Sequence, residues 1–450
     1  MHVGNRRKIN LSGSMFRSFI EGGFLYVDKS LFIEHVLENG SDTLLFTRPR
    51  RMGKSLNLDM LRVFLDPLEN KDGSVPVLFS GLCIENRPVF DELSRHPVID
   101  LNFRDYPADA YRQMFRIKIK AQATRYLTKD QYSEELALVL DEDNALLPKA
   151  LQFLIENIHA VTGAKPFVLI DEYDKLFIDG AKLGGEAFGA IREFTRNVLA
   201  SALKDNPHLG KGVLTGVNRI AQESMFSELN NIEIHGVLRK SAFDTDFGFT
   251  EEEVKEICTA AELKDVREWY NGYRIGEKKV YFTYSVMTYL KEGRLGNYWG
   301  QSGVMDSIKN ALTPERFERL SEIVGGFGDA RFATPVKDRL TADDMDGYRR
   351  SDAFYSLLLQ SGYLTYDETG FQNEYEVYLP NRELQSVWQQ FLLSHYYNTP
   401  ASAIMEIFGL VSEKVRFEAR LSETIDGKLS YFDFDSREPE KTYHVFMLGL

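Results

Sequence analysis

The tripeptide Gly53-Lys54-Ser55 carries the clearest chemistry in this sequence. An apolar run, Leu44-Leu45-Phe46, precedes it, and the residues from Leu56 to Leu65 have the pattern of a helix. A strand, a tight loop and a helix joined at Gly-Lys-Ser are typical of a phosphate-binding loop, in which backbone N–H groups and the helix N-terminus face the phosphates. This layout predicts that Lys54 reaches the β- and γ-phosphate oxygens and that the Ser55 hydroxyl binds Mg²⁺.

The loop departs from the usual pattern G-x-x-x-x-G-K-[ST] at its first position. Arg48 stands five residues before Gly53, where the pattern has glycine, and Pro49 lacks a backbone N–H that could serve a phosphate. Arg50 and Arg51 offer planar guanidinium groups that can bind phosphate oxygens through two hydrogen bonds. We select Arg51 as a candidate arginine finger supplied by the same chain. The alternative is that both arginines pair with surface acids.

A second motif runs from Lys165 to Asp174. Four apolar residues after Pro166 suit a strand buried on both faces of a parallel sheet. Asp171 and Glu172 follow at the C-terminal end of this strand, where α/β sheets bind ligands. Asp171 is predicted to hold Mg²⁺ through water, and Glu172 to orient or deprotonate the attacking water. Either motif alone also fits an ordinary strand and turn, but the pair in this order favours nucleotide binding.

A third segment, residues 212–219, reads as another buried strand that ends in polar residues. In ATPases with a catalytic Glu after the Asp, the strand inserted beside the loop strand carries a polar sensor at its tip. Asn218 is the predicted sensor of the γ-phosphate, with Thr215 as the other candidate and a plain turn residue as the alternative. Arg219 could stabilise charge or cap a turn.

The elements around these motifs alternate between strands and helices, which indicates a parallel sheet with helices on both faces. We expect a strand over 96–103 and helices over 29–38, 125–140, 148–162 and 188–202. After about residue 240 helices dominate, and Thr250 with Glu253 has the signature of a helix cap. The fold class is therefore α/β, a P-loop NTPase sheet followed by a mostly helical lid or winged-helix-like module.

These motifs carry a resemblance to the bacterial AAA-ATPase-like family, whose members usually end in a PD-(D/E)XK nuclease-like domain. The segment from Arg48 to Leu56 is close to that family's RPRRFGKSL loop, with Met52 where the family usually has Phe. Further matching segments are 24–30, 169–174, 215–220, 225–231, 269–273 and 360–365. The resemblance makes Arg48 in place of glycine a family trait, and it implies an ATPase that uses ATP and Mg²⁺. The predicted nucleotide-binding residues are Arg48, Pro49, Arg50, Arg51, Met52, Gly53, Lys54, Ser55 and Leu56.

The resemblance also suggests three parts. We expect an ATPase domain over 1–240, the lid or winged-helix-like module over 241–410, and the start of a nuclease-like domain over 411–450. The sequence stops before the Asp and the Glu-x-Lys of such a domain, so it is expected to be truncated. No nuclease activity is therefore expected, and DNA would be a partner only through the missing part.

Composition fits an intracellular enzyme. The 450 residues carry a formal net charge of −13, which argues against extensive non-specific binding of nucleic acid. The two cysteines have no metal or disulfide spacing, and no apolar run approaches the roughly 18 residues of a membrane helix. No signal peptide is recognisable. We expect a cytoplasmic protein without a membrane partner, and homo-oligomer formation stays open.

The sequence therefore predicts Mg-dependent ATP binding and hydrolysis, with catalytic roles for Glu172, Lys54, Asn218 and Arg51. The nucleotide state would move the C-terminal module and so regulate a nuclease-like domain or a partner. One alternative is a nucleotide-bound scaffold or switch with negligible hydrolysis, because Arg48 replaces the first glycine. Another is a DNA-binding regulator that uses the winged-helix-like region, and the net charge of −13 counts against it.

Overall fold

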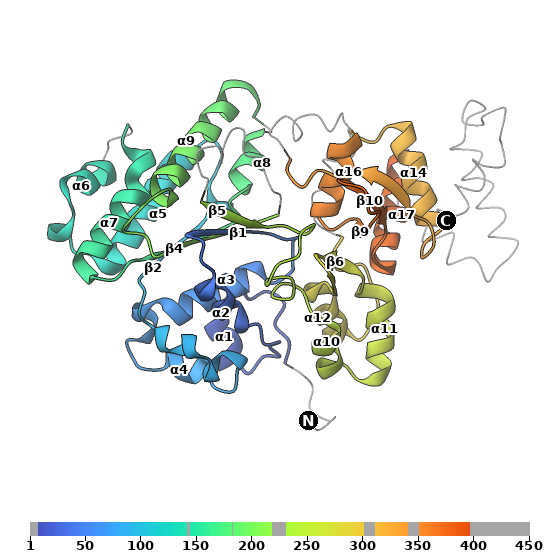
Figure 1. The fold of residues 1–450 in the computed structure, drawn as a ribbon, viewed down its shortest axis with the longest axis horizontal. Coiled ribbons are helices and arrows are strands. Elements are labelled where there is room, and N and C mark those ends of the chain that lie inside the picture. Colours follow the sequence, from blue (N-terminus) through green and yellow to red (C-terminus); the bar gives the residue numbers. More distant parts are fainter. Residues whose placement is uncertain are drawn as a thin grey trace, which may run out of the picture.

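The protein was analysed as a computed structural model, which describes residues 8–141, 145–181, 183–217, 231–300, 311–340 and 351–396. A five-stranded sheet in the order β2-β3-β4-β1-β5 lies at its centre, and every neighbouring pair in it is parallel (Figure 1). Its strands are β1 (Thr43–Thr47), β2 (Val98–Asn102), β3 (Phe167–Asp171), β4 (Lys211–Gly216) and β5 (Ile232–His235). The predicted α/β sheet is thus confirmed.

Strand register brings the predicted motifs to one edge of the sheet. Thr47, the last residue of β1, pairs with Gly216 at the end of β4, and Asn102 at the end of β2 pairs with Asp171 at the end of β3. β4 lies between β3 and β1, as expected for a strand inserted beside the loop strand. Because all these strands end at the same edge, the polar residues that follow them converge there.

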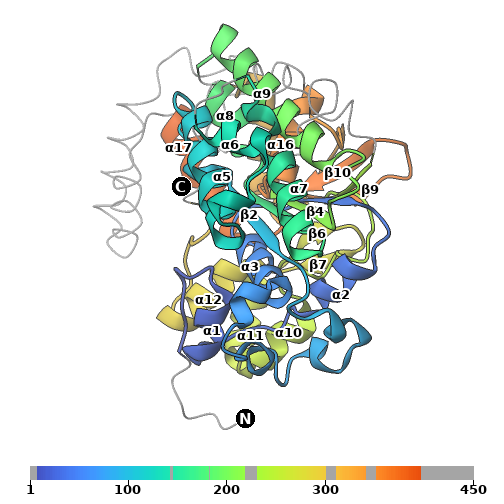
Figure 2. The same cartoon turned by 90° about the vertical axis from the view of Figure 1, so that its left-hand side faces the viewer.

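Helices cover both faces of the sheet, and Figures 1 and 2 agree on their arrangement. One face carries α1 (Phe16–Glu21), α2 (Leu31–Glu38), α3 (Lys54–Leu65) and α4 (Val75–Leu78). The other carries α5 (Tyr111–Tyr126), α6 (Glu134–Asp141), α7 (Ala150–Thr162) and α9 (Gly185–Leu203), while α8 (Lys175–Ala181) follows β3. Short 3-10 turns are η1 (Pro67–Asn70), η2 (Cys83–Asn86), η3 (Pro88–Glu92), η4 (Phe103–Asp105), η5 (Lys129–Gln131) and η6 (Leu147–Lys149). Each face has its own apolar core, because the strands are buried on both sides.

One expected helix is interrupted. The sequence predicts a helix over 125–140, whereas α5 ends at Tyr126 and α6 begins at Glu134. Thr128 caps the intervening η5 turn, and its backbone N–H donates to the Gln131 side chain over 2.8 Å. This reciprocal cap satisfies the backbone groups that a continuous helix would have used, so the apolar spacing on its own was misleading.

The C-terminal region combines helices with two small sheets. Its helices are α10 (Glu251–Ile257), α11 (Ala260–Tyr270), α12 (Thr283–Glu292), α14 (Pro314–Gly325), α16 (Ser351–Gln360) and α17 (Arg382–Tyr396). β6 (Tyr273–Ile275) pairs with β7 (Lys278–Val280), and β8 (Phe332–Pro335), β9 (Thr365–Glu368) and β10 (Glu374–Tyr378) form an antiparallel sheet in the order β8-β10-β9. The predicted cap at Thr250 is confirmed, since Thr250 and Glu253 form a capping box.

The N-terminal segment packs on this region. Ile9 belongs to the apolar cluster of α10 to α12, and Leu11, Leu25 and Val27 pack against that cluster. The sheet domain and the C-terminal region therefore share a boundary lined by the first described residues. Within the described ranges, no helix is both long enough and apolar enough to cross a membrane. The expected boundary at residue 240 stays a prediction, and the segment 411–450 lies outside the described residues.

Candidate functional site

The loop between β1 and α3 turns through two residues with positive φ. Gly53, immediately before α3, has φ 85°, and Arg51 has φ 61°. Glycine adopts this conformation without strain, whereas arginine adopts it only where surrounding contacts hold it. The turn directs the N-terminus of α3, with the N–H groups of its first turn, toward the edge of the sheet where β1, β3 and β4 end.

Lys54 lies inside this loop. Its ammonium donates to the carbonyl of Arg48 over 2.9 Å and to that of Pro49 over 2.7 Å. Burial lowers the pKa of Lys54 to about 8, although the carboxylates of Asp171, Asp174 and Glu172 act in the opposite direction. An ammonium that exchanges two backbone carbonyls for a phosphate gains a full negative charge as its partner.

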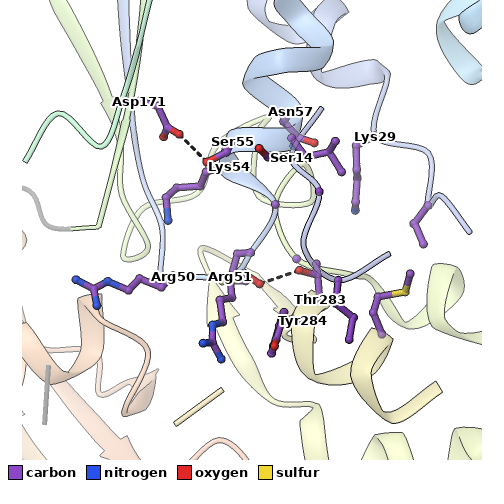
Figure 3. A pocket seen from close by; sticks show the side chains of 18 of the residues that line it. Ser14, Lys29, Arg50, Arg51, Lys54, Ser55, Asn57, Asp171, Thr283 and Tyr284 are labelled. Carbon is purple, nitrogen blue, oxygen red and sulfur yellow. Dashed lines mark hydrogen bonds between the residues drawn. The ribbon is translucent and has the colours of Figure 1, made fainter. Parts of the chain in front are cut away.

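Asp171 accepts hydrogen bonds from four donors, one of which is the side-chain amide of Asn102 at 3.4 Å from its Oδ2. Its Oδ2 accepts from Ser55 Oγ over 2.5 Å, while its Oδ1 accepts from Thr215 Oγ1 and from its neighbour's backbone N–H over 3.0 Å. Figure 3 shows the Ser55 and Asp171 side chains meeting. A hydroxyl and a carboxylate are the hard oxygen donors that Mg²⁺ prefers, and Mg²⁺ keeps water in its other positions. The pair therefore fits this ion.

In the described part of the chain, no group of three or more His, Cys, Asp or Glu side chains could hold a metal ion. A bound Mg²⁺ would need phosphate or water oxygens in addition to Ser55 and Asp171. This donor set suits an ion that arrives together with a nucleotide.

Glu172 follows Asp171 in a left-handed conformation, with φ 51°. Positive φ is uncommon for a glutamate and persists only where surrounding contacts hold the backbone, as the bond from its N–H to Asp171 does here. Burial raises the pKa of Glu172, the charge of Asp171 raises it further, and the charges of Arg104 and Lys54 lower it. Glu172 also lines the cavity described below, so its carboxylate is accessible to a ligand.

Arg48 is fully buried and serves the sheet. Its guanidinium donates to the carbonyls of Thr47 over 2.9 Å and His235 over 2.6 Å, and it lies 5.3 Å from the centre of the Phe247 ring. It therefore joins β1 to the end of β5. Among the described residues that line the cavity, the loop contributes Arg50 to Asn57. The side chain of Arg48 and that of Pro49 lie behind this surface.

Arg51 contacts the C-terminal region. Its guanidinium donates to the Tyr298 carbonyl and lies 4.3 Å from the centre of the Tyr284 ring. Figure 3 shows it pointing toward Tyr284 and away from Ser55 and Asp171. In this conformation the Arg51 guanidinium does not face Lys54, Ser55 or Asp171. Arg50 also lines the cavity, and its charge acts on Lys54.

One cavity of about 820 Å³ connects these side chains, a volume within the usual range for ligand sites. Its polar end holds Lys54, Ser55, Asp171 and Glu172. Its other end holds a cluster of apolar side chains of the N-terminal segment and the C-terminal region, namely Leu11, Leu25, Val27, Phe249 and Met287. The charged residues Lys29 and Asp246 also line the cavity. We call the part with the apolar cluster the apolar end.

One residue of this site, Arg104, was not predicted from the sequence, and another role was considered for a second, Thr215. Arg104 lines the cavity next to Glu172, and it follows β2, the strand beside β3. The rule that parallel strands end at one edge could have found it. Thr215, a candidate sensor, is fully buried and bonds Asp171, so it orients that carboxylate. Asn218 and Arg219 lie outside the described residues.

Comparisons with known proteins add a family match. Residues 12–226 match the AAA-ATPase_like family, described as "Predicted AAA-ATPase". A protein of Azotobacter chroococcum mcd 1, named "Uncharacterized protein in vnfD 5'region", is 30% identical over 416 residues, which cover 89% of this chain and 73% of that protein. Among solved structures, a Walker-type ATPase of Pyrococcus abyssi aligns with 81% of this chain and 96% of its own, at 14% identity and a TM-score of 0.40.

Proposed function

Because the chain belongs to the AAA-ATPase-like family, we propose that it binds and hydrolyses Mg-ATP and that the nucleotide state moves its C-terminal region. The single observation that carries this proposal is the 2.5 Å hydrogen bond between Ser55 and Asp171 at the polar end of the cavity. It brings a loop hydroxyl and a strand carboxylate together across 116 positions of sequence. Two such oxygens beside a buried lysine are what a Mg-nucleotide requires.

Binding would use residues of both ends of the cavity. The N–H groups of the first turn of α3 would face the phosphates, and Lys54 would leave the carbonyls of Arg48 and Pro49 to contact the β- and γ-phosphate oxygens. The apolar end, with Val27 and Met287, would receive the base. ATP in particular, as opposed to another nucleoside triphosphate, is part of the proposal.

Hydrolysis would use Glu172 as the base. Its carboxylate would accept the proton of the attacking water as the oxygen of that water bonds to the γ-phosphorus, and ADP would leave. A raised pKa makes the ionised carboxylate a stronger proton acceptor. Mg²⁺ would be held by Ser55 and Asp171 and would neutralise charge on the β- and γ-phosphates.

The remaining roles are also proposals. Asn218 would sense the γ-phosphate. Arg51 could act as an arginine finger only after it leaves Tyr298. Arg50, which also lines the cavity, is the other candidate for a phosphate contact. The output would be motion of the C-terminal region that regulates a nuclease-like domain or a partner, an idea that rests on the family resemblance.

A nucleotide-bound switch with slow hydrolysis is the second candidate. The observation that favours it is that Arg51 is held by the C-terminal region, away from the phosphate end. A site that lacks a charge stabiliser hydrolyses nucleotide slowly until a rearrangement supplies one, because a finger contributes about 10³- to 10⁵-fold in rate. Turnover by the isolated protein separates the two candidates.

The test is to measure the binding and steady-state hydrolysis of Mg-ATP by the wild type, Lys54→Ala and an exposed control, Glu256→Gln. We expect Lys54→Ala to weaken binding by about 100-fold or more, because a buried charge-assisted contact is lost, while the control behaves as the wild type. Equal affinities of Lys54→Ala and the wild type would contradict the proposed phosphate site. Binding without turnover in the wild type would favour the switch.

A further inference from the structure

Three consecutive carbonyls of the phosphate loop accept hydrogen bonds from the C-terminal region. Trp299 Nε1 donates to the Arg50 carbonyl over 3.0 Å, and Thr283 Oγ1 donates to the Arg51 carbonyl over 2.8 Å. The backbone N–H of Gly248 donates to the Met52 carbonyl over 3.2 Å. Because three carbonyls in a row have donors from the C-terminal region, that region fixes the path of residues 50–52.

Side chains of the same loop add to the contact. Arg51 donates to the Tyr298 carbonyl, and the Met52 side chain is buried in the apolar cluster that includes Trp299. Pro49 packs so closely against Gly362 that a Cβ at Gly362 would lie 3.0 Å from that of Pro49. We call the residues that donate to the loop or accept from it the loop clamp: Gly248, Thr283, Tyr298 and Trp299.

Glu383 holds two members of the loop clamp. This residue lies in the first turn of α17 and is fully buried. Its Oε1 accepts from the backbone N–H of Tyr298 over 2.6 Å and from that of Trp299 over 2.7 Å. The same oxygen accepts from Ser285 Oγ over 3.1 Å, on the helix that also carries Thr283. One carboxylate therefore joins α12, α17 and the 298–299 segment.

The charge of Glu383 also acts on the loop. Burial raises the pKa of this carboxyl to about 7, while the hydrogen bonds from Trp299, Ser285 and Tyr298, and to a smaller extent the positive charge of Arg51, oppose the rise. A buried carboxylate without donors would be costly, so the three donors and Arg51 are what makes this position tolerable. Loss of the carboxylate would leave two buried N–H groups without an acceptor, which releases the segment that they belong to.

We propose that Glu383 is a positioning residue for the nucleotide site, which acts by holding Tyr298 and Trp299 against Arg50 and Arg51. The clamp keeps Arg51 at its positive φ and so keeps the turn that presents Gly53 and α3 to the cavity. Release of the clamp lets the loop relax and weakens nucleotide binding. This inference rests on the proposed function for its ligand, and by linkage a bound nucleotide would in turn stabilise the clamp.

A purely structural role of Glu383 is the alternative to exclude. Two of the three tryptophans provide a matched pair for this purpose. Trp299 and Trp388 are both buried in the same apolar cluster, and each indole N–H donates to a backbone carbonyl, that of Arg50 over 3.0 Å and that of Tyr363 over 3.2 Å. Only the first of these carbonyls belongs to the phosphate loop. A general loss of stability would affect both variants alike.

The experiment combines two readouts on the full chain. The first is the Kd of a fluorescent ATP analogue with Mg²⁺ for the wild type, Glu383→Ala, Glu383→Gln, Trp299→Phe and Trp388→Phe. We expect about tenfold weaker binding for Glu383→Ala and about three- to tenfold for Trp299→Phe, while Trp388→Phe stays near the wild type. Glu383→Gln keeps a carbonyl acceptor and should recover most of the affinity.

The second readout needs no nucleotide. Trypsin cleaves after arginine, and cleavage after Arg50 and Arg51, followed by mass spectrometry, reports release of the loop. We expect faster cleavage in Glu383→Ala and Trp299→Phe than in the wild type and Trp388→Phe. Equal cleavage of Trp299→Phe, Trp388→Phe and the wild type would overturn the clamp. This outcome is decisive even if Glu383→Ala fails to fold, because it compares only the tryptophan pair with the wild type.

The two readouts separate the two proposals. Wild-type Kd values in folded Glu383→Ala and Trp299→Phe would overturn the positioning role while the nucleotide site stands. No binding of the analogue by any of the proteins, together with faster cleavage in Glu383→Ala and Trp299→Phe, would overturn the proposed ligand and leave the coupling of α17 to the loop in place.

Discussion

The titration of Glu383 predicts a pH dependence of stability that one substitution should remove. The folded-state pKa of this buried carboxyl is about 7, against 4.5 for an unperturbed glutamate. Because the folded-state pKa is raised, the folded protein favours protonated Glu383. The contribution of this proton to the free energy of unfolding is fully present below pH 4.5 and is lost as the pH rises through 7. A glutamine in its place does not titrate. The difference in unfolding free energy between wild type and Glu383→Gln should therefore change across this window.

The magnitude follows from the two pKa values. A carboxyl that ionises near pH 4.5 in the unfolded chain and near pH 7 in the folded protein changes the free energy of unfolding by about 2 to 3 kcal/mol between pH 5 and pH 8. The phenol of Tyr270, on which the charge of Glu383 acts, has a raised pKa and so stays neutral in this range. The change should therefore belong to Glu383.

The assay is urea unfolding of both proteins at pH 5, 6, 7 and 8, in one buffer system at constant ionic strength. All other titrating groups contribute equally to the two curves, so the difference isolates Glu383. We expect the wild type to lose stability relative to Glu383→Gln as the pH rises. A difference that stays constant within about 0.5 kcal/mol would refute the reasoning, because the carboxyl would then ionise at no cost to the fold.

Two further predictions concern the sheet and the Asp171 carboxylate. Thr215→Val keeps the shape of the side chain but removes the hydroxyl that bonds Asp171. The Mg²⁺ concentration for half-maximal nucleotide binding should therefore rise about tenfold. An unchanged Mg²⁺ dependence would contradict this role of Thr215. Arg48→Met leaves the carbonyls of Thr47 and His235 without their buried donor. The free energy of unfolding, measured by thermal unfolding, should therefore fall by about 2 to 4 kcal/mol. A fall below about 0.5 kcal/mol, as for a surface substitution, would contradict the structural role of Arg48.

The parts of the site that depend on residues close together in the sequence could be predicted from local sequence patterns. The apolar run before Gly53 and the pattern after it gave β1 and α3, and the run before Asp171 gave β3. The order of parallel strands then brings Ser55 and Asp171 to one edge of the sheet, although 116 positions separate them. These inferences work because the strand period and the loop chemistry are encoded within a few residues.

The partners of the loop arginines could not be predicted in this way. Arg48 bonds a carbonyl 187 positions away, and Arg51 bonds one 247 positions away. A backbone carbonyl has no sequence signature, so a pattern cannot indicate which one an arginine will reach. The same reason explains why the role of Glu383 was not foreseen, since its donors are two backbone N–H groups and a serine. Such contacts depend on how the C-terminal region packs on the loop.

The measurement that tests the central claim most directly is ATP turnover and retention by Glu172→Gln beside the wild type. If Glu172 is the base that activates water, the variant should bind Mg-ATP with an affinity near that of the wild type and lose at least about 100-fold in turnover. The bound nucleotide, recovered and separated after incubation, should then be ATP in the variant and largely ADP in the wild type. Equal turnover by the two proteins would contradict the account, because hydrolysis would not then depend on the carboxylate at this site.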